Sequence, residues 1–268
     1  MTTSGNSEIR QDEIRQIVRE NYRQVAVQEE GCCGPSCGCH SEPEALSQLM
    51  GYSLEEIQAV PEGANMGLGC GNPQAIAGLQ TGEVVLDLGS GGGFDCLLAA
   101  RQVGPTGQVI GVDMTPEMVS KARRIAQEMG VTHVEYRLGE IEHLPVADAS
   151  VDVIISNCVI NLSPEKEQVF RESFRVLKPG GRLAISDIVT SAPLPPEVRQ
   201  DMALYTECVA GAASVDELEA MLARIGFQEV AIRPKEESRT LIREWELGGN
   251  LDDYILSATI QARKPGQV

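Results

Sequence analysis

The sequence predicts an α/β fold with a mainly parallel sheet and helices on both faces. From Glu83 onward, short apolar runs typical of strands alternate with amphipathic segments typical of helices. This alternation is characteristic of parallel strands joined by right-handed crossovers. A glycine-rich loop over residues 89–93 follows the first strand, and Asp113 ends the second. Because open α/β sheets bind ligands at the carboxyl ends of their strands, both features predict a ligand site at that edge.

The segment before this alternation is expected to form short helices and loops. Apolar side chains fall near one face over residues 8–29, which predicts an amphipathic helix. A second helix is expected over 41–50, and the capping-box pattern at 53–56 predicts the start of a third. The segment 31–40 is too rich in glycine and cysteine for a helix, and 63–73 is a second glycine-rich stretch. Both are expected to be loops.

The remaining elements follow the chain in a regular order. Helices are expected over 94–102, 115–130 and 164–177, and strands over 84–88, 108–113, 133–139, 151–157, 181–189, 227–233 and 254–263. The second of these helices has Pro116 in its first turn and Gly130 as its stop. A turn over 178–181 should precede the fifth strand, and two more helices should follow the proline-rich joint at 191–198.

Composition and charge exclude several classes of protein. The chain has 268 residues, which suits one large domain or one domain with an appendage. Its net charge is −17, with the acidic residues spread along the chain. Since no basic stripe is present, we expect no nucleic-acid partner. The N-terminus lacks the pattern of a secretory signal, and no run of about 18 apolar residues occurs. We therefore expect a cytoplasmic protein with no membrane partner.

The glycine loop alone is a weak signal, because a tight turn also favours glycine. A nicotinamide dinucleotide site requires G-x-G-x-x-G, and counting from Gly89 places Phe94 at the last glycine position. The sequence therefore argues against that class of site. Asp113 lies 20 residues after Gly93 and is placed to accept hydrogen bonds from a ribose diol.

The pattern D-x-G-x-G-x-G over residues 87–93, with Asp113 after the second strand, resembles the class I S-adenosylmethionine-dependent methyltransferases. The segments GEIEHLP at 139–145 and LKPGG at 177–181 are similar to the family's adenine-edge segment and to its turn before strand five. The resemblance implies a Rossmann-like class I methyltransferase fold with an antiparallel last strand. It also implies S-adenosyl-L-methionine as cofactor, with a cysteine-bearing N-terminal extension added to the fold.

The same resemblance assigns residues to the methionine end of the cofactor. The methionine part would be held by Asp87 and by the backbone of Gly89, Ser90 and Gly91. Asn157 resembles the family's polar residue at the end of strand four, near the transferred methyl group. A structural cap of the strand end is an equally good interpretation of Asn157.

Four further residues are assigned by resemblance to the nucleoside end. Asp113 would take the ribose hydroxyls, and Met114 would pack on adenine. Glu140 would meet the adenine amino group, with Ile141 supplying a backbone contact. The residues themselves show only that suitable chemical types stand at the joints between strands and helices.

Three cysteines, Cys70, Cys158 and Cys208, fall in loops or helix edges near the expected position of the cofactor's sulfonium. A free cysteine is usually a small buried hydrophobe, and for Cys96, with its apolar neighbours, that is our prediction. None of the three has a C-x-x-C spacing or a paired histidine, which argues against structural zinc. Soft thiolates select soft metals and metalloids. Three converging thiolates without a nearby histidine or aspartate suit a trivalent metalloid that carries a lone pair.

The segments around these cysteines, LGCGNP, SNCVINLSPEKEQVFRE and YTECVAGA, resemble the arsenite S-adenosylmethionine methyltransferases, as does VIGVDMTPEMVSKAR. The resemblance covers residues 13–233. It implies that trivalent arsenic, delivered as arsenite or its thiol conjugate, is held by Cys158 and Cys208 with help from Cys70. The arsenic lone pair would attack the sulfonium methyl and give methylated arsenicals. Because methylation formally oxidises arsenic, a thiol reductant (glutathione or thioredoxin) would return electrons.

The cysteines of segment 31–40 have three interpretations. Cys32 or Cys33 could exchange a disulfide with Cys70 as a capture or relay arm. The C-G-C-H stretch at 37–40 could instead chelate a soft metal. A loop that merely tolerates cysteines is as well supported as the relay.

We expect three regions: an N-terminal helix with the cysteine-rich segment (1–62), a cofactor-binding domain with the substrate loop (63–190), and a substrate-covering and C-terminal region (191–268). Arsenite methylation is the predicted function. One alternative is a methyltransferase of a small organic acceptor with structural cysteines. Another is a metalloid-sequestering protein on the same scaffold. The intact glycine loop and Asp113 weigh against the last, because a pure binder needs no methyl-donor site.

Overall fold

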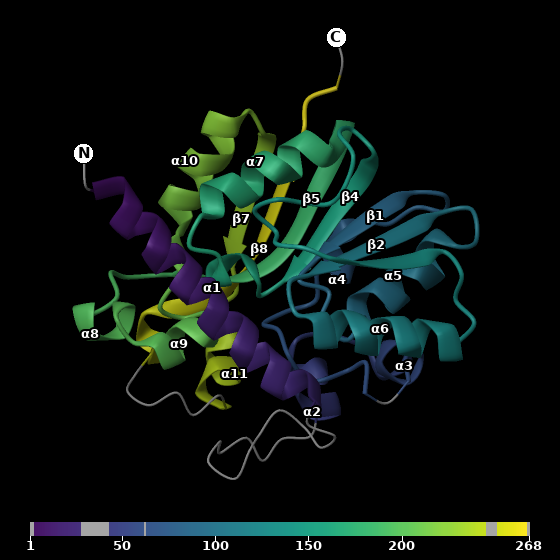
Figure 1. The fold of residues 1–268 in the computed structure, drawn as a ribbon, viewed down its shortest axis with the longest axis horizontal. Helices are drawn as coiled ribbons and strands as arrows, with labels where there is room; N and C mark the ends of the chain where they lie inside the picture. The colour runs from purple at the N-terminus through teal and green to yellow at the C-terminus, as the bar shows by residue number, and fades with distance from the viewer. Residues whose placement is uncertain (1–2, 28–42, 62, 245–250, 267–268) are drawn as a thin grey trace.

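The protein is described here by a computed structural model over residues 3–27, 43–61, 63–244 and 251–266. A mixed sheet forms the middle layer, and helices cover both of its faces (Figure 1). This arrangement confirms the predicted α/β class. Within these ranges, no helix combines the length and the apolar character needed to span a bilayer. The cysteine-rich segment 31–40 lies outside the described residues.

The sheet has the strand order β3-β2-β1-β4-β5-β8-β7, with the short β6 paired to β5. Its strands are β1 (Val84–Leu88), β2 (Gln108–Asp113), β3 (Val134–Leu138), β4 (Val151–Asn157), β5 (Leu177–Thr190), β6 (Ala213–Ser214), β7 (Gln228–Pro234) and β8 (Ile255–Arg263). Neighbours from β3 to β5 run parallel, whereas β8 is antiparallel to both β5 and β7. The predicted antiparallel last strand is therefore confirmed. The division of the chain into three regions stays a prediction.

Helices cover both faces because side chains alternate along each strand. The described helices are α1 (Thr3–Val27), α2 (Pro43–Leu49), α3 (Leu54–Gln58), α4 (Gln74–Ala77), α5 (Phe94–Val103), α6 (Pro116–Glu128), α7 (Lys166–Val176), α8 (Pro196–Arg199), α9 (Met202–Thr206), α10 (Val215–Ile225) and α11 (Ser238–Glu244). Val85 and Val153 pack in the cluster formed with α5 and α6, whereas Leu86 and Ile154 pack with α7 and α10. Each such burial contributes about 1.5–3 kcal/mol to folding.

The sequence predicted long helices better than short ones. Ser53 caps α3 with both bonds of the expected capping box. After the proline-rich joint the sequence predicts two helices, but the structure has three before β7: α8 with four residues, α9 with five and α10 with eleven. Helix α11, with seven residues, was not predicted. Segments of four to seven residues are too short for the 3.6-residue periodicity to be recognised.

The turn expected over 178–181 is part of β5 instead. Val151 of β4 pairs with Leu177, and Val153 then pairs with Arg182. Two steps along β4 therefore face five steps along β5, so the predicted turn forms an irregularity inside the strand. Glycine and proline in this segment gave the turn signal, but they fit a bulge equally well.

The net charge of −17 predicts that salt stabilises this fold. Repulsion between like charges opposes the compact state, and its range shrinks from about 10 Å at 0.1 M salt to about 3 Å at 1 M. We expect the midpoint of thermal unfolding to rise by several degrees over that range of KCl, since about 1 kcal/mol shifts the midpoint by roughly 2–4 °C. A midpoint that falls would show that favourable ion pairs dominate the charge–charge energy.

Candidate active site

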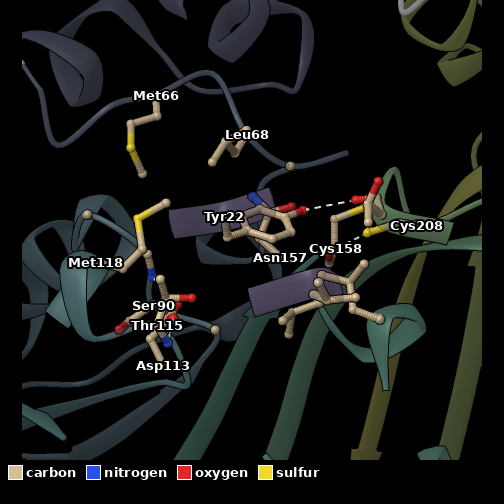
Figure 2. Close-up of a pocket in the computed structure, with 18 of the residues that line it drawn as sticks. Tyr22, Met66, Leu68, Ser90, Asp113, Thr115, Met118, Asn157, Cys158 and Cys208 are labelled. Carbon is tan, nitrogen blue, oxygen red and sulfur yellow. Dashed lines mark hydrogen bonds between the residues drawn. The ribbon is translucent and has the colours of Figure 1, made fainter. Parts of the chain in front are cut away.

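A cavity of about 620 Å³ opens at the carboxyl ends of β1, β2 and β4, a volume within the usual range for small-molecule sites. Strand order reverses between β1 and β4, which is where open α/β sheets bind ligands. Figure 2 shows thiols on one side of this space and Asp113 with its neighbours on the other. The first side is called the thiol half: Cys158 and Cys208 line the cavity, and the sulfur of Cys70 lies within 4.8 Å of the sulfur of Cys158. The other side, lined by Asp87, Asp95 and Asp113, is called the carboxylate half.

The structure brings nearly all the predicted cofactor contacts to this cavity. The lining includes Asp87, Gly89, Ser90, Gly91, Asp113, Met114, Ile141 and Asn157. Among the predicted cofactor contacts, Glu140 does not line the cavity, and its carboxylate is paired with Arg19 of α1. The sequence prediction therefore selected one continuous surface, although the role of each residue stays a prediction.

The glycine loop is braced by the carboxylate of Asp113. Oδ2 of Asp113 accepts a hydrogen bond from Gly91 N–H at 2.9 Å, and Oδ1 accepts one from Thr115 N–H at 2.8 Å. Burial raises the pKa of Asp113, and these backbone donors partly offset the rise. The hydroxyl of Ser90 is buried without a hydrogen-bond partner in the described part of the chain. Because an unpaired buried hydroxyl is unfavourable, this atom suits contact with a polar ligand.

Asp87 and Asp95 place two buried carboxyl groups at the same wall. Burial, and then the charge of Asp95, raise the pKa of Asp87 well above its usual range. Burial also raises the pKa of Asp95 to about 6, against the donors Tyr52 and Gln74. The thiol of Cys96, buried as predicted, donates to Asp87 at 3.3 Å. A cation nearby stabilises such carboxylates, so this half favours a positively charged ligand group.

Asp95 and Tyr52 were not predicted as site residues. The Tyr52 hydroxyl lies 2.8 and 3.0 Å from the two carboxylate oxygens of Asp95, and both residues line the cavity. The available signal was weak, since Asp95 stands in the first turn of α5 directly after the glycine loop. An acidic residue there is equally explained by the helix dipole.

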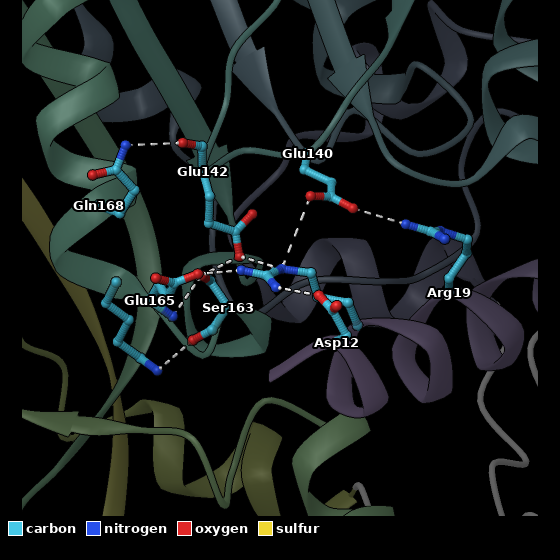
Figure 3. Close-up of polar contacts among 9 residues, drawn as sticks. Asp12, Arg19, Glu140, Glu142, Ser163, Glu165 and Gln168 are labelled. Carbon is cyan, nitrogen blue, oxygen red and sulfur yellow. Dashed lines mark hydrogen bonds and ion pairs between the residues drawn. The ribbon is translucent and has the colours of Figure 1, made fainter. Parts of the chain in front are cut away.

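The segment after β3 is tied to α1 by ion pairs (Figure 3). The carboxylate of Glu140 lies 3.0 Å from Arg19 and 4.0 Å from Arg15. Glu142 lies 3.4 Å from Arg15 and accepts a hydrogen bond from the Ser163 hydroxyl at 2.5 Å. Glu140 is therefore directed towards α1, and its contact with the adenine amino group stays a prediction.

Helix α1 covers the cavity and contributes to its lining. Val18, Asn21 and Tyr22 all face this space, and the Tyr22 hydroxyl donates to the carbonyl of Thr206 at 3.3 Å. Figure 2 shows Tyr22 between the two halves of the cavity. The helix was predicted from its apolar spacing, but none of its residues was assigned to the site. Periodicity identifies an apolar face without identifying what that face covers.

The three predicted cysteines lie together and are buried. The Sγ atoms of Cys70 and Cys158 are within 4.8 Å of each other, and the Cys208 thiol donates to the carbonyl of Cys158 at 2.8 Å. All three are free thiols. Contact with the Cys208 and Cys70 thiols, together with burial, raises the pKa of Cys158 well above its usual range. These effects favour the neutral form of the Cys158 thiol.

Two of these cysteines have an uncommon backbone conformation. The φ angles of Cys158 and Cys208 are +57° and +63°, and such a conformation costs a residue with a side chain about 1 kcal/mol or more. The Cys158 N–H donates to the carbonyl of Ser186 at 2.8 Å, which holds the turn in place. A cysteine that only fills a core needs no such backbone. The strain therefore favours the functional interpretation of both thiols.

The expectation that no aspartate lies near the thiols is wrong. A carboxylate oxygen of Asp187 lies within 4.8 Å of the sulfurs of Cys70 and Cys158. Asp187 accepts hydrogen bonds from Ile160 N–H at 3.0 Å and from the Asn161 amide at 2.9 Å. Burial raises the pKa of Asp187 to about 6. The Asp187 carboxylate therefore holds the turn that follows Cys158. It was not predicted because Asp187 lies within the mainly apolar sequence of β5.

Fold and cavity together define a class I methyltransferase. A family model described as a methyltransferase domain matches residues 79–226. A crystal structure titled as an arsenic(III) S-adenosylmethionine methyltransferase from Chlamydomonas reinhardtii is 34% identical, with a TM-score of 0.58. The match covers 85% of this chain and 76% of that one.

Two relatives define the family more narrowly. An arsenite methyltransferase of Halobacterium salinarum is 53% identical in an alignment that covers 96% of this chain and 68% of the relative. An arsenite methyltransferase of Aquipseudomonas alcaligenes is 43% identical in an alignment that covers 72% of this chain and 56% of the relative. The chain belongs to the S-adenosylmethionine-dependent arsenite methyltransferase family.

Replacing Asp113 tests the carboxylate half. In Asp113→Asn one carboxylate oxygen becomes an amide that cannot accept a hydrogen bond, so the brace on the glycine loop and the expected ribose contact cannot both persist. Because hydrogen bonds to charged groups contribute about 1.5–3 kcal/mol, we expect S-adenosylhomocysteine to bind roughly ten- to hundredfold more weakly in calorimetry. Arsenite binding should be unchanged, and the exposed Asp216→Asn serves as the matched control. Unaltered affinity in Asp113→Asn would remove this carboxylate from the cofactor site.

Proposed function

We propose that the protein transfers the methyl group of S-adenosyl-L-methionine to trivalent arsenic held by Cys158, Cys208 and Cys70. The observation that carries this proposal is the clustering of three buried thiols from three separate segments. Cys158 and Cys208 line the cavity, and the sulfur of Cys70 lies within 4.8 Å of the sulfur of Cys158. The opposite wall favours a positively charged group, as a sulfonium donor requires. A metalloid-sequestering protein would not need the carboxylate half of the cavity. A methyltransferase of an organic acceptor would not need cysteines with a strained backbone.

Arsenic binding exchanges ligands without a net change of charge. Each thiol passes its proton to a departing hydroxyl or thiolate ligand of arsenic, which leaves as water or free thiol while an As–S bond forms. Cys158 is neutral before this exchange, because its pKa is raised by the neighbouring thiols and by burial. The buried site therefore never holds an uncompensated thiolate, whose desolvation would be costly.

The protein's contribution to methyl transfer is alignment and exclusion of water. When bound, S-adenosyl-L-methionine supplies a methyl group on a positively charged sulfonium. Cys158 and Cys208 fix the arsenic so that its lone pair faces the carboxylate half, and no general base is needed. Tyr22 and the rest of α1 cover this space. Correct alignment of two reacting partners is worth several kcal/mol of the barrier.

Methylation formally oxidises arsenic by two electrons, so the cycle needs a reductant. Two thiols can supply this pair as they form a disulfide. We extend the proposal to glutathione or thioredoxin as the electron source, with thioredoxin as a protein partner and the cytoplasm as the location, where thiols are kept reduced. Cys32 or Cys33 would relay electrons to Cys70, and both lie outside the described residues.

Serine variants test the arsenic ligands directly. We expect Cys158→Ser and Cys208→Ser each to abolish the first methyl transfer, because a serine oxygen is a much poorer ligand for a soft metalloid. The measurement is arsenic speciation after incubation with arsenite, S-adenosyl-L-methionine and a thiol. Calorimetry with S-adenosylhomocysteine should show an intact cofactor site in both variants. Full activity in either variant would remove that cysteine from the site.

A further inference from the structure

Asn157 is the last residue of β4, and its side-chain amide reaches the loop that carries Cys70. Oδ1 of Asn157 accepts a hydrogen bond from Cys70 N–H at 3.0 Å, and Nδ2 donates to the carbonyl of Gly71 at 2.7 Å. Nδ2 also donates to the hydroxyl of Tyr52 at 3.1 Å. Reversing the amide would place two donors or two acceptors face to face, so the pattern fixes its orientation.

The loop is shaped to receive this amide. Gly69 has a φ of +128°, and a Cβ built there would lie 2.7 Å from both terminal atoms of the Asn157 amide. A Cβ on Gly71 would lie 2.9 Å from the hydroxyl of Ser186. Cys70 is therefore held between two glycines that allow the backbone to lie close to the end of β4 and to Ser186 within β5. The two hydrogen bonds between the loop and Asn157 therefore fix the position of the Cys70 backbone relative to the end of β4.

The hydrogen-bonding groups of the Asn157 amide are all used within the chain. An asparagine amide has two N–H donors, and Asn157 gives them to Gly71 and Tyr52. Both donors are therefore used within the chain, as expected if Asn157 has a structural role at the end of the strand, and its place near the transferred methyl group stays a prediction. Asn157 also stands next to Cys158 in the chain. Asn157 therefore fixes the backbone of Cys70 and also directly precedes Cys158, the second proposed arsenic ligand.

We infer that Asn157 is a positioning residue that sets the Cys70 thiol beside Cys158 and so completes a three-sulfur site. This inference rests on the proposed function, since it concerns the same arsenic ligands. The contact network continues from Asn157 through Tyr52 to Asp95 in the carboxylate half. Asn157 therefore also fixes the thiol half relative to the half that receives the methyl donor.

The test counts arsenic–sulfur bonds by X-ray absorption on the full chain with one equivalent of arsenite. Asn157→Asp keeps an acceptor for Cys70 N–H but turns an oxygen towards the Gly71 carbonyl. In Gly69→Ala the added Cβ would lie 2.7 Å from the terminal atoms of the Asn157 amide and so displace it. We expect three As–S bonds in the unaltered protein and two in both variants, with kcat at least about tenfold lower because alignment is lost.

A matched control separates this effect from general backbone strain. Gly130 also has a positive φ, +68°, but a Cβ there meets nothing within 4 Å. Gly130→Ala should therefore keep three As–S bonds. Gly130→Ala should also bind S-adenosylhomocysteine within about twofold of the unaltered affinity, a difference of about 0.4 kcal/mol.

Three As–S bonds in both Asn157→Asp and Gly69→Ala would overturn the inference and leave the proposed function standing. If the variants keep three As–S bonds but bind S-adenosylhomocysteine much more weakly, the inference is also overturned, and Asn157 is a cofactor contact instead. Absence of As–S bonds in the unaltered protein would instead overturn the proposed function, and the inference with it.

Discussion

The turn after β4 is the constraint on which the site depends. Cys158 adopts a left-handed backbone conformation there, and its N–H is held by the carbonyl of Ser186 on the neighbouring strand. Val159 then packs over the glycine loop, where a Cβ on Gly89 would lie 2.4 Å from it. The chain itself therefore requires a glycine at position 89, whatever ligand approaches it. A single turn joins the two halves of the cavity and fixes the distance between them.

Buried carboxyl groups lie at both halves of the cavity but in different numbers. The carboxylate half has three acidic groups whose ionised form a cation would stabilise, whereas the thiol half has Asp187, whose carboxylate accepts hydrogen bonds from Ile160 N–H and the Asn161 amide. Helix α1 is held over both by the buried contact of Arg15 with Glu142. Buried ion pairs of this kind contribute little net stability, because desolvation offsets the attraction. We regard this one as a device that specifies where α1 lies.

Local patterns in the sequence were sufficient for the strands, the glycine loop, Asp113 and Cys158, since each stands at or beside a recognisable strand end. Cys70 and Cys208 lie in loops, and the resemblance of their flanking segments to a known family identified them. The network around Asp95 was not accessible in this way. Tyr52 reaches Asp95 across 43 residues, and Arg15 reaches Glu142 across 127. Glu140 has the residue type that the family resemblance requires, but its carboxylate is paired with Arg19. Residue type and spacing cannot report which partner a side chain meets after folding.

The central claim is that a sulfonium methyl group passes to arsenic within this cavity. A single-turnover reaction with methyl-labelled S-adenosyl-L-methionine, arsenite and a thiol tests it most directly. The account predicts that the label appears in a methylated arsenical, in equal amount to the S-adenosylhomocysteine formed. Label that stays in the donor, or that appears in a product without arsenic, would contradict it.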